Sequence, residues 1–157
     1  MSAAPTPTTA PTFPTTSIPA FEFGKSISSN GFAELVDVED GLAAWISTFT
    51  TIKAISLAEP SAPFVAGDAD SLGTASGVFV DEDYIYSSGS EGFAIFDVDS
   101  PMGEPLSTYD FGWSNTIVVE GGLAYLAAGS NLLILDVNNP TAPVELSRTQ
   151  LVGTAPI

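Results

Sequence analysis

The sequence predicts an all-β fold, and three observations support this prediction. From about Phe21 onward, short apolar runs are separated by Gly, Asp, Asn, Ser and Pro, and β-branched and aromatic residues are enriched. The runs alternate with period two and are broken too often for helices. The same plan of runs and turns then recurs along the chain at a fixed spacing. Such a repeat has to be interpreted before any fold is assigned.

The repeat is clearest in the second half of the chain. The segment from Gly73 to Gly112 aligns with the segment from Gly112 to Gly153 at a spacing of 39 positions, and a slip of one or two residues near the second proline lengthens the later copy. The matched pairs include Val80 and Val119, Tyr84 and Leu123, Tyr86 and Tyr125, Ile95 and Ile134, Asp97 and Asp136, and Pro101 and Pro140. These pairs indicate two copies of one structural unit.

A more diverged copy precedes them. It has Val38, Leu42, Ala44, Leu57, Pro60 and Pro63 where the last copy has Val119, Leu123, Tyr125, Val137, Pro140 and Pro143. Each copy reads as strand, acidic or Gly turn, strand, Gly/Ser turn, strand, Pro turn, strand. Four short antiparallel strands in about 40 residues is the size of a β-propeller blade.

The turns and strands of each unit have physical reasons. Pro fixes φ and lacks a donor, so the Pro-x-x-Pro stretch ends the third strand and directs the chain to the outer strand. Gly-Ser at 89–90 and at 129–130 is expected to close the preceding hairpin. Phe93 and Ile95 on one face, and Ala94, Phe96 and Val98 on the other, are apolar, as expected for a strand that is covered on both faces.

We therefore expect an all-β, β-propeller-like protein with three four-stranded antiparallel blades and an extended N-terminal segment. The propeller is incomplete, since closed propellers have about four to eight blades. Residues 1–17 form a Thr/Pro-rich tail, 18–31 an orphan N-terminal strand and linker, and 32–157 the blades, at about 32–72, 73–112 and 113–153.

At these residues the sequence resembles the LVIVD-repeat family. Its units carry a strand like "LxIIDVSxPxxPxxLG" followed by "GxAxxVxVxGxYAYVA", which are similar to "FAIFDVDSPMGEPL", "LLILDVNNPTAPVEL", "GTASGVFVDEDYIYSS" and "SNTIVVEGGLAYLAAG" here. The resemblance covers about Gly73 to Gly153 well and Phe32 to Leu72 weakly. It implies propeller blades, usually in extracellular or surface-associated bacterial and archaeal proteins. The family defines a structural unit, so it contributes no catalytic residues.

Charge and composition exclude several partners. The chain has 19 Asp and Glu against three Lys and Arg, for a net charge of −16. Such a surface repels nucleic acid and anionic lipid headgroups. With no Cys and no His, disulfides, thiol nucleophiles, imidazole bases and the usual zinc sites are excluded. No run of about 18 apolar residues is present, so no membrane span is predicted.

The first 20 residues are rich in Thr and Pro and carry no side-chain charge. The segment is expected to be an extended or polyproline-like linker. Alternatively, dense Thr beside Pro suggests an O-glycosylated stalk. The acceptors would be Thr6, Thr8, Thr9, Thr12, Thr15 and Thr16.

Chemical sites are weakly supported. The carboxylates fall mostly at turns of the repeat, where Asp serves turn geometry and solubility. We expect no enzyme activity and no cofactor. A structural calcium ion is conceivable at two acidic stretches, although the EF-hand spacing is missing. The weak candidate ligands are Asp68, Asp70, Asp81 and Asp83.

Three blades leave open faces, and two explanations compete. The chain is either a fragment of a larger propeller that acts as an adhesin-like module recognising protein or glycan, or a structural subunit that binds copies of itself head-to-tail. In the second case an orphan strand at its N-terminus completes or extends the sheet of another copy, and a head-to-tail contact that does not close generates a filament. Ile18, Phe21 and Phe23 would form the inward face of that strand. Either reading places the protein outside the cell or on its surface.

Overall fold

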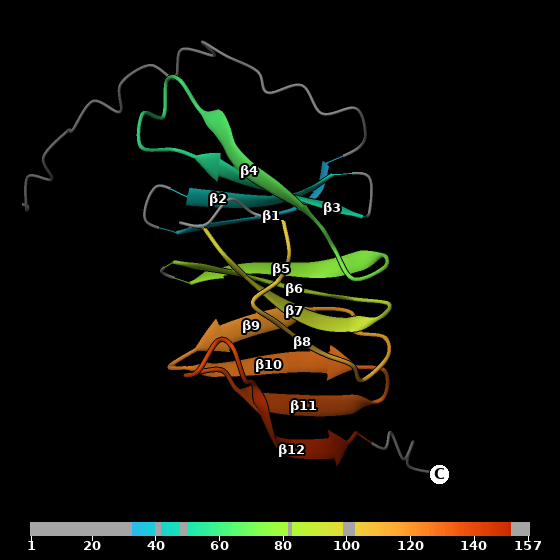
Figure 1. The fold of residues 1–157 in the computed structure, drawn as a ribbon. Helices are drawn as coiled ribbons and strands as arrows, with labels where there is room; N and C mark the ends of the chain where they lie inside the picture. Colours follow the sequence, from blue (N-terminus) through green and yellow to red (C-terminus); the bar gives the residue numbers. More distant parts are fainter. Residues whose placement is uncertain (1–32, 40–41, 48–49, 82, 99–102, 152–157) are drawn as a thin grey trace, which may run out of the picture.

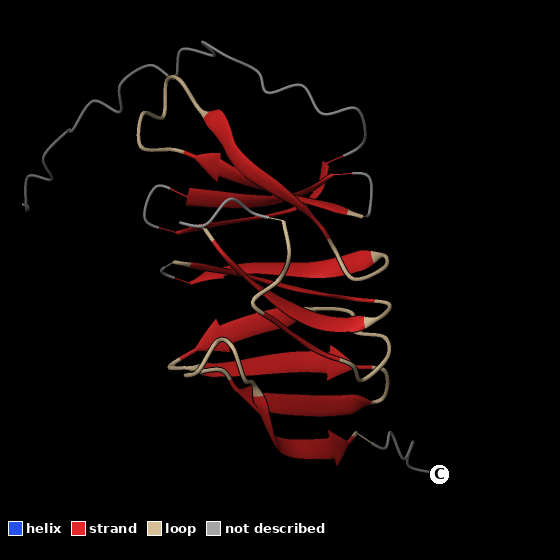
Figure 2. Cartoon of the chain, viewed as in Figure 1, coloured by secondary structure: helices blue, strands red, loops and turns tan. Residues whose placement is uncertain are grey.

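The computed structural model describes residues 33–39, 42–47, 50–81, 83–98 and 103–151. Within these ranges every regular element is a β-strand (Figure 2), and there is no helix of the length and hydropathy that a bilayer crossing requires. The first four strands are β1 (Ala33–Glu39), β2 (Leu42–Ser47), β3 (Thr51–Ser56) and β4 (Phe64–Asp70). The next four are β5 (Ala75–Asp81), β6 (Tyr84–Gly89), β7 (Gly92–Asp97) and β8 (Ser107–Tyr109). The last four are β9 (Ile117–Glu120), β10 (Leu123–Ala128), β11 (Asn131–Asp136) and β12 (Val144–Gln150).

These strands form three four-stranded antiparallel sheets, each in chain order. The sheets β1–β4, β5–β8 and β9–β12 are the first, second and third blades. Figure 1 shows them stacked one over another, with β1 against β5 and β5 against β9. The predicted all-β fold of three four-stranded blades is confirmed. The extended N-terminal segment lies outside the described residues and stays a prediction.

The hairpins follow from local sequence. Between β9 and β10 the loop is Gly121-Gly122, with φ of 58° and 75°, as the two-residue type I′ turn requires. Between β10 and β11 the turn is Gly129-Ser130, as predicted. In the second blade the turn lies one residue later than predicted, because Gly89 still pairs with Gly92 across the β6–β7 ladder.

The proline loops are built alike in the first and third blades. The amide of Ala62 donates to the carbonyl of Glu59 at 2.8 Å, and the amide of Ala142 donates to the carbonyl of Asn139 at 3.0 Å. Both are four-residue turns with Pro at the second position, which suits the fixed φ of proline. The equal turns show that the diverged first copy follows the same plan.

Two apolar cores lie between the blades. In the core between blades one and two, Ile52 and Ala54 of β3 pack with Ala94 and Phe96 of β7. The opposite side chains of β7, represented by Phe93, join the core between blades two and three. The second blade is therefore buried on both faces, as the apolar sequence of β7 predicted.

Blades two and three lie close together at Gly77 of β5. A Cβ atom built there would lie 2.6 Å from Ser88 Oγ and 3.0 Å from Ile117 Cγ2. Both distances are shorter than ordinary van der Waals contacts. The Ser88 hydroxyl is also buried and has no hydrogen-bond partner among the described residues. Gly77 therefore lets β9 pack against the second blade.

We expect Gly77→Ala to lower the free energy of unfolding by about 1–3 kcal/mol, because the new methyl group overpacks this contact. Ser88→Ala removes an unpaired buried hydroxyl and should be neutral or stabilising by about 1 kcal/mol. The double variant should recover part of the loss. Urea unfolding of the four proteins checks this cycle, and a Gly77→Ala variant as stable as the parent would contradict the packing.

Candidate interaction surface

The third blade has one covered face and one open face. In β10 and β11 the side chains of Ala124, Leu126, Leu133 and Leu135 point toward the second blade and are buried. The opposite face of the blade is here named the C-terminal end face. Its apolar residues are Val118, Leu123, Tyr125, Leu132 and Ile134, and Glu120 and Asp136 lie at its edge. No described residue outside the third blade packs on it.

The repeat identifies the surface of the second blade that corresponds to this face. At the same repeat positions the second blade has Phe79, Tyr84, Tyr86, Phe93 and Ile95. All five contribute to the core between blades two and three. Tyr86, Phe93 and Ile95 are 3%, 0% and 0% exposed because the third blade covers them. Their counterparts Tyr125, Leu132 and Ile134 are only partly buried, and Val118 is 48% exposed. The C-terminal end face therefore repeats the blade-covered face of the second blade, and no described blade covers it.

The first blade carries the complementary open face, here named the N-terminal end face. Val38 of β1 is 55% exposed, whereas its counterparts Val80 and Val119 are 1% and 4% exposed. Asp37 points the other way, and its Oδ2 accepts a hydrogen bond from the Val80 amide at 2.9 Å. The N-terminal end face also includes Lys53 and Ile55 of β3 and Asp68 of β4. Ile55 is buried, and Lys53 and Asp68 place charged groups in the described part of this face.

The outer strands of blades two and three are joined by a polar contact. Tyr109 Oη on β8 donates to Glu145 Oε2 on β12 at 2.7 Å. Arg148 donates two hydrogen bonds to the same carboxylate, from Nη2 to Oε2 at 2.8 Å and from Nε to Oε1 at 3.2 Å. These hydrogen bonds, that of Arg148 first, lower the pKa of Glu145 to about 2. The pKa of Tyr109 is raised, chiefly because its hydroxyl donates to Glu145.

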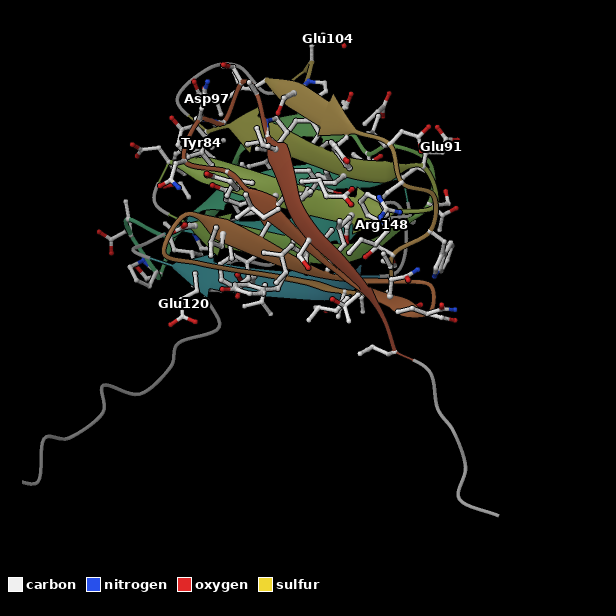
Figure 3. All side chains as sticks on the ribbon, turned by 90° about the horizontal axis from the view of Figure 1, so that it is seen from below. Tyr84, Glu91, Asp97, Glu104, Glu120 and Arg148 are labelled. Atoms are coloured by element: carbon white, nitrogen blue, oxygen red, sulfur yellow. The ribbon has the colours of Figure 1, made fainter. Side chains whose placement is uncertain are left out.

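At the edge of the C-terminal end face, Asp136 is held in place. Its Oδ1 accepts hydrogen bonds from the Asn138 amide at 3.0 Å and from Asn138 Nδ2 at 2.7 Å. The backbone bond and then the side-chain bond lower the pKa of Asp136, so it stays ionised. Figure 3 shows Glu120 on the same side of the molecule as Tyr84 and Asp97, which lie at the corresponding end of the second blade.

The site residues predicted from sequence are only partly placed. Asp68 and Asp70 lie on β4, Asp81 ends β5, and Asp83 lies in the following turn. In the described part of the chain, no three acidic, His or Cys side chains gather closely enough to hold a metal ion. The predicted strand residues Ile18, Phe21 and Phe23 lie outside the described residues. The same holds for the predicted glycosylation sites Thr6, Thr8, Thr9, Thr12, Thr15 and Thr16.

The sequence predicted open blade faces but did not name the residues of the C-terminal end face. The signal was present, because the last copy of the repeat supplies the residues that an earlier copy buries. The contact among Tyr109, Glu145 and Arg148 carried no such signal, since its residues come from outer strands where the copies differ most.

The Glu145 contact makes stability depend on pH in a defined range. A carboxyl group whose pKa falls from 4.5 to about 2 on folding contributes stability that is fully present above pH 4.5. That contribution is lost as the pH drops through about 2. Between these values the melting temperature of the parent should therefore fall more steeply than that of Glu145→Gln. Glu104→Gln, which changes an exposed carboxylate of the β7–β8 loop, is the control and should follow the parent. Equal slopes for the parent and Glu145→Gln would contradict the geometry.

Comparison with solved structures supports the propeller architecture. The β-propeller domain of Cps50 (Swd1) from Myceliophteria thermophila matches with a TM-score of 0.61 and 14% identity, covering 78% of this chain and 41% of that one. The computationally designed Ika4 protein matches with a TM-score of 0.66 and 9% identity, covering 83% of this chain and 81% of that one. Hsv2 from Kluyvelomyces marxianus matches with a TM-score of 0.58 and 10% identity, covering 79% of this chain and 48% of that one.

These likenesses establish the fold alone, and the chain spans less than half of the Cps50 domain and of Hsv2. No curated protein matches the sequence. The model of the LVIVD repeat matches residues 72–105 and 112–150, which contain most of the second blade and nearly all of the third. Those are the stretches in which the sequence resemblance was clearest. The chain belongs to the LVIVD-repeat family, and its repeats fold as blades of a β-propeller.

Proposed function

We propose that this chain is a non-enzymatic structural subunit of an extracellular or cell-surface assembly. It binds copies of itself head-to-tail, the C-terminal end face of one copy against the N-terminal end face of the next. Such a contact joins two different surfaces, so it generates a filament unless the rotation closes a ring.

One observation carries this proposal. Val118, Tyr125, Leu132 and Ile134 occupy repeat positions that a neighbouring blade covers in the second blade, yet no described residue from another blade covers them here. Exposed apolar patches with a polar edge mark interaction surfaces. The first blade of a second copy has the same four-stranded antiparallel order as the third blade, which covers the corresponding face of the second.

The chemistry of the chain supports a structural role. The sequence has no His and no Cys, so the usual general bases and thiol nucleophiles are missing. The described carboxylate with the largest pKa shift is Glu145, and its oxygens accept hydrogen bonds from Arg148 and Tyr109. That arrangement stabilises a contact between strands and leaves no carboxylate oxygen aimed at a substrate.

We also propose that the N-terminal strand, with Ile18, Phe21 and Phe23 on its inward face, is donated to another copy. Each described blade already has its fourth strand. A donated strand would therefore add as a fifth strand to a free outer edge, such as that of β4 or β12. Both strands have seven residues, whereas β8 has three. The Thr-rich tail that precedes the donor would carry O-linked sugars on the outside of the assembly.

A second function is favoured by the comparisons. The chain spans 41% and 48% of two structurally similar proteins, one of them a propeller domain. This supports a recognition module in which further blades complete a larger propeller that binds protein or glycan. In that case blades from the same protein would cover both end faces, and the chain studied alone would associate weakly or without order.

Val118→Glu tests the end face. Because Val118 is half exposed, the change should leave the fold intact while it places a charge in the proposed joint. We expect the mass from light scattering to fall from a concentration-dependent oligomer to a monomer. Trp113→Glu introduces the same charge at an equally exposed apolar side chain in the loop between β8 and β9, which belongs neither to the end faces nor to the edges of β4 and β12, and should associate like the parent. A parent that is monomeric at every concentration would reject self-association.

Deletion of residues 1–24 tests strand donation separately. If the N-terminal strand joins copies, the truncated chain should form shorter assemblies in electron micrographs than the full chain at equal concentration. Assemblies of unchanged length would reject strand donation and leave face-to-face binding of the blades as the joint.

A further inference from the structure

Lys53 has an unusual position for its type. It is one of only three Lys and Arg residues in the chain, and of the other two Arg148 is engaged by Glu145. At the same repeat position the second blade has Ala94 and the third has Leu133, which are both buried between blades. Lys53 instead lies on the N-terminal end face. Its cross-strand neighbour is Asp68, yet no ion pair joins them.

The repeat indicates where Lys53 would lie in an assembly. Leu133 belongs to the core that contains Tyr86, Phe93 and Ile95 of the second blade. The third blade has Tyr125, Leu132 and Ile134 at those three positions. If the first blade of another copy covers the third blade in the same way, the stem of Lys53 packs on Tyr125 and its neighbours.

We propose that Lys53 of one copy binds the acidic edge of the C-terminal end face of the next, formed by Glu120 and Asp136, and that this contact sets the head-to-tail polarity. The inference rests on the proposed self-association. A lysine stem can lie along apolar surface while its ammonium group reaches a polar edge. Asp136 is suited to receive it, because Asn138 holds its Oδ1 and no described residue bonds its Oδ2.

Charge explains why other pairings are disfavoured. Two C-terminal end faces would bring two copies of Glu120 and Asp136 together without a cation, and a pairing of two N-terminal end faces would leave both acidic edges without one. Each copy carries a net charge of −16, so any association works against repulsion. The head-to-tail pairing alone sets Lys53 against the acidic edge of Glu120 and Asp136, and such complementarity selects the partner surface and register.

Charge exchange in the full chain tests the contact. Lys53→Glu alone places Glu against Glu120 at every joint, and Glu120→Lys alone places Lys against Lys53. We expect each to associate about tenfold more weakly than the parent, or worse. Mixed in equal amounts they can alternate, which restores opposite charges at every joint. The mixture, and the double variant, should therefore recover parental assembly mass in sedimentation velocity.

Glu91→Lys is the matched control. It makes the same charge change as Glu120→Lys in the β6–β7 turn, on the opposite side of the molecule (Figure 3), and should not weaken association. Single variants that assemble like the parent, or a mixture that stays as weak as its components, would overturn the Lys53 contact while self-association stands. A parent that stays monomeric would reject the proposed function and this inference together.

Discussion

A blade of this protein is a sheet with apolar side chains on both faces, and these side chains are removed from water most fully where neighbouring blades cover both faces. The second blade satisfies this condition. Phe93 of β7 faces the third blade and its neighbour Ala94 faces the first, and both are almost fully buried. The other features follow from that packing. Gly77 brings the inner strands of blades two and three together, and the contact from Tyr109 to Glu145 holds their outer strands.

At the two ends of the stack, no described blade covers the outer face of the first or the third blade. The third blade repeats the face that the second blade buries, with Tyr125 and Ile134 in place of Tyr86 and Ile95. In the proposed assembly, apolar burial would drive the two end faces together, and the net charge of −16 would oppose association. Lys53 matters because it is a rare positive charge placed on one of these faces. Burial of apolar surface would then supply the affinity between two copies, and charge would set the head-to-tail polarity of their association.

Much of this architecture could be predicted from sequence because the repeat reports local requirements. Pro60 and Pro140 occupy equal turns, and the pair Ile95 and Ile134 lies in equal strands, as their spacing implied. The degree of burial could not be predicted position by position, because it depends on whether a neighbouring blade is present. The role of Glu145 was hidden for a related reason, since its partner Tyr109 lies 36 residues away on a strand with little repeat signal.

Tyr86 and Tyr125 provide the most direct test of the central claim, because they share a repeat position but not a covering blade. Hydroxyl-radical labelling followed by mass spectrometry can measure both rings in one sample across a range of protein concentrations. If another copy covers the C-terminal end face, we expect Tyr125 to be labelled readily in dilute solution and to become protected as the concentration rises. Tyr86 should stay protected throughout. Labelling of Tyr125 that does not change with concentration, in samples where oligomers form, would contradict the proposal that another copy covers the C-terminal end face.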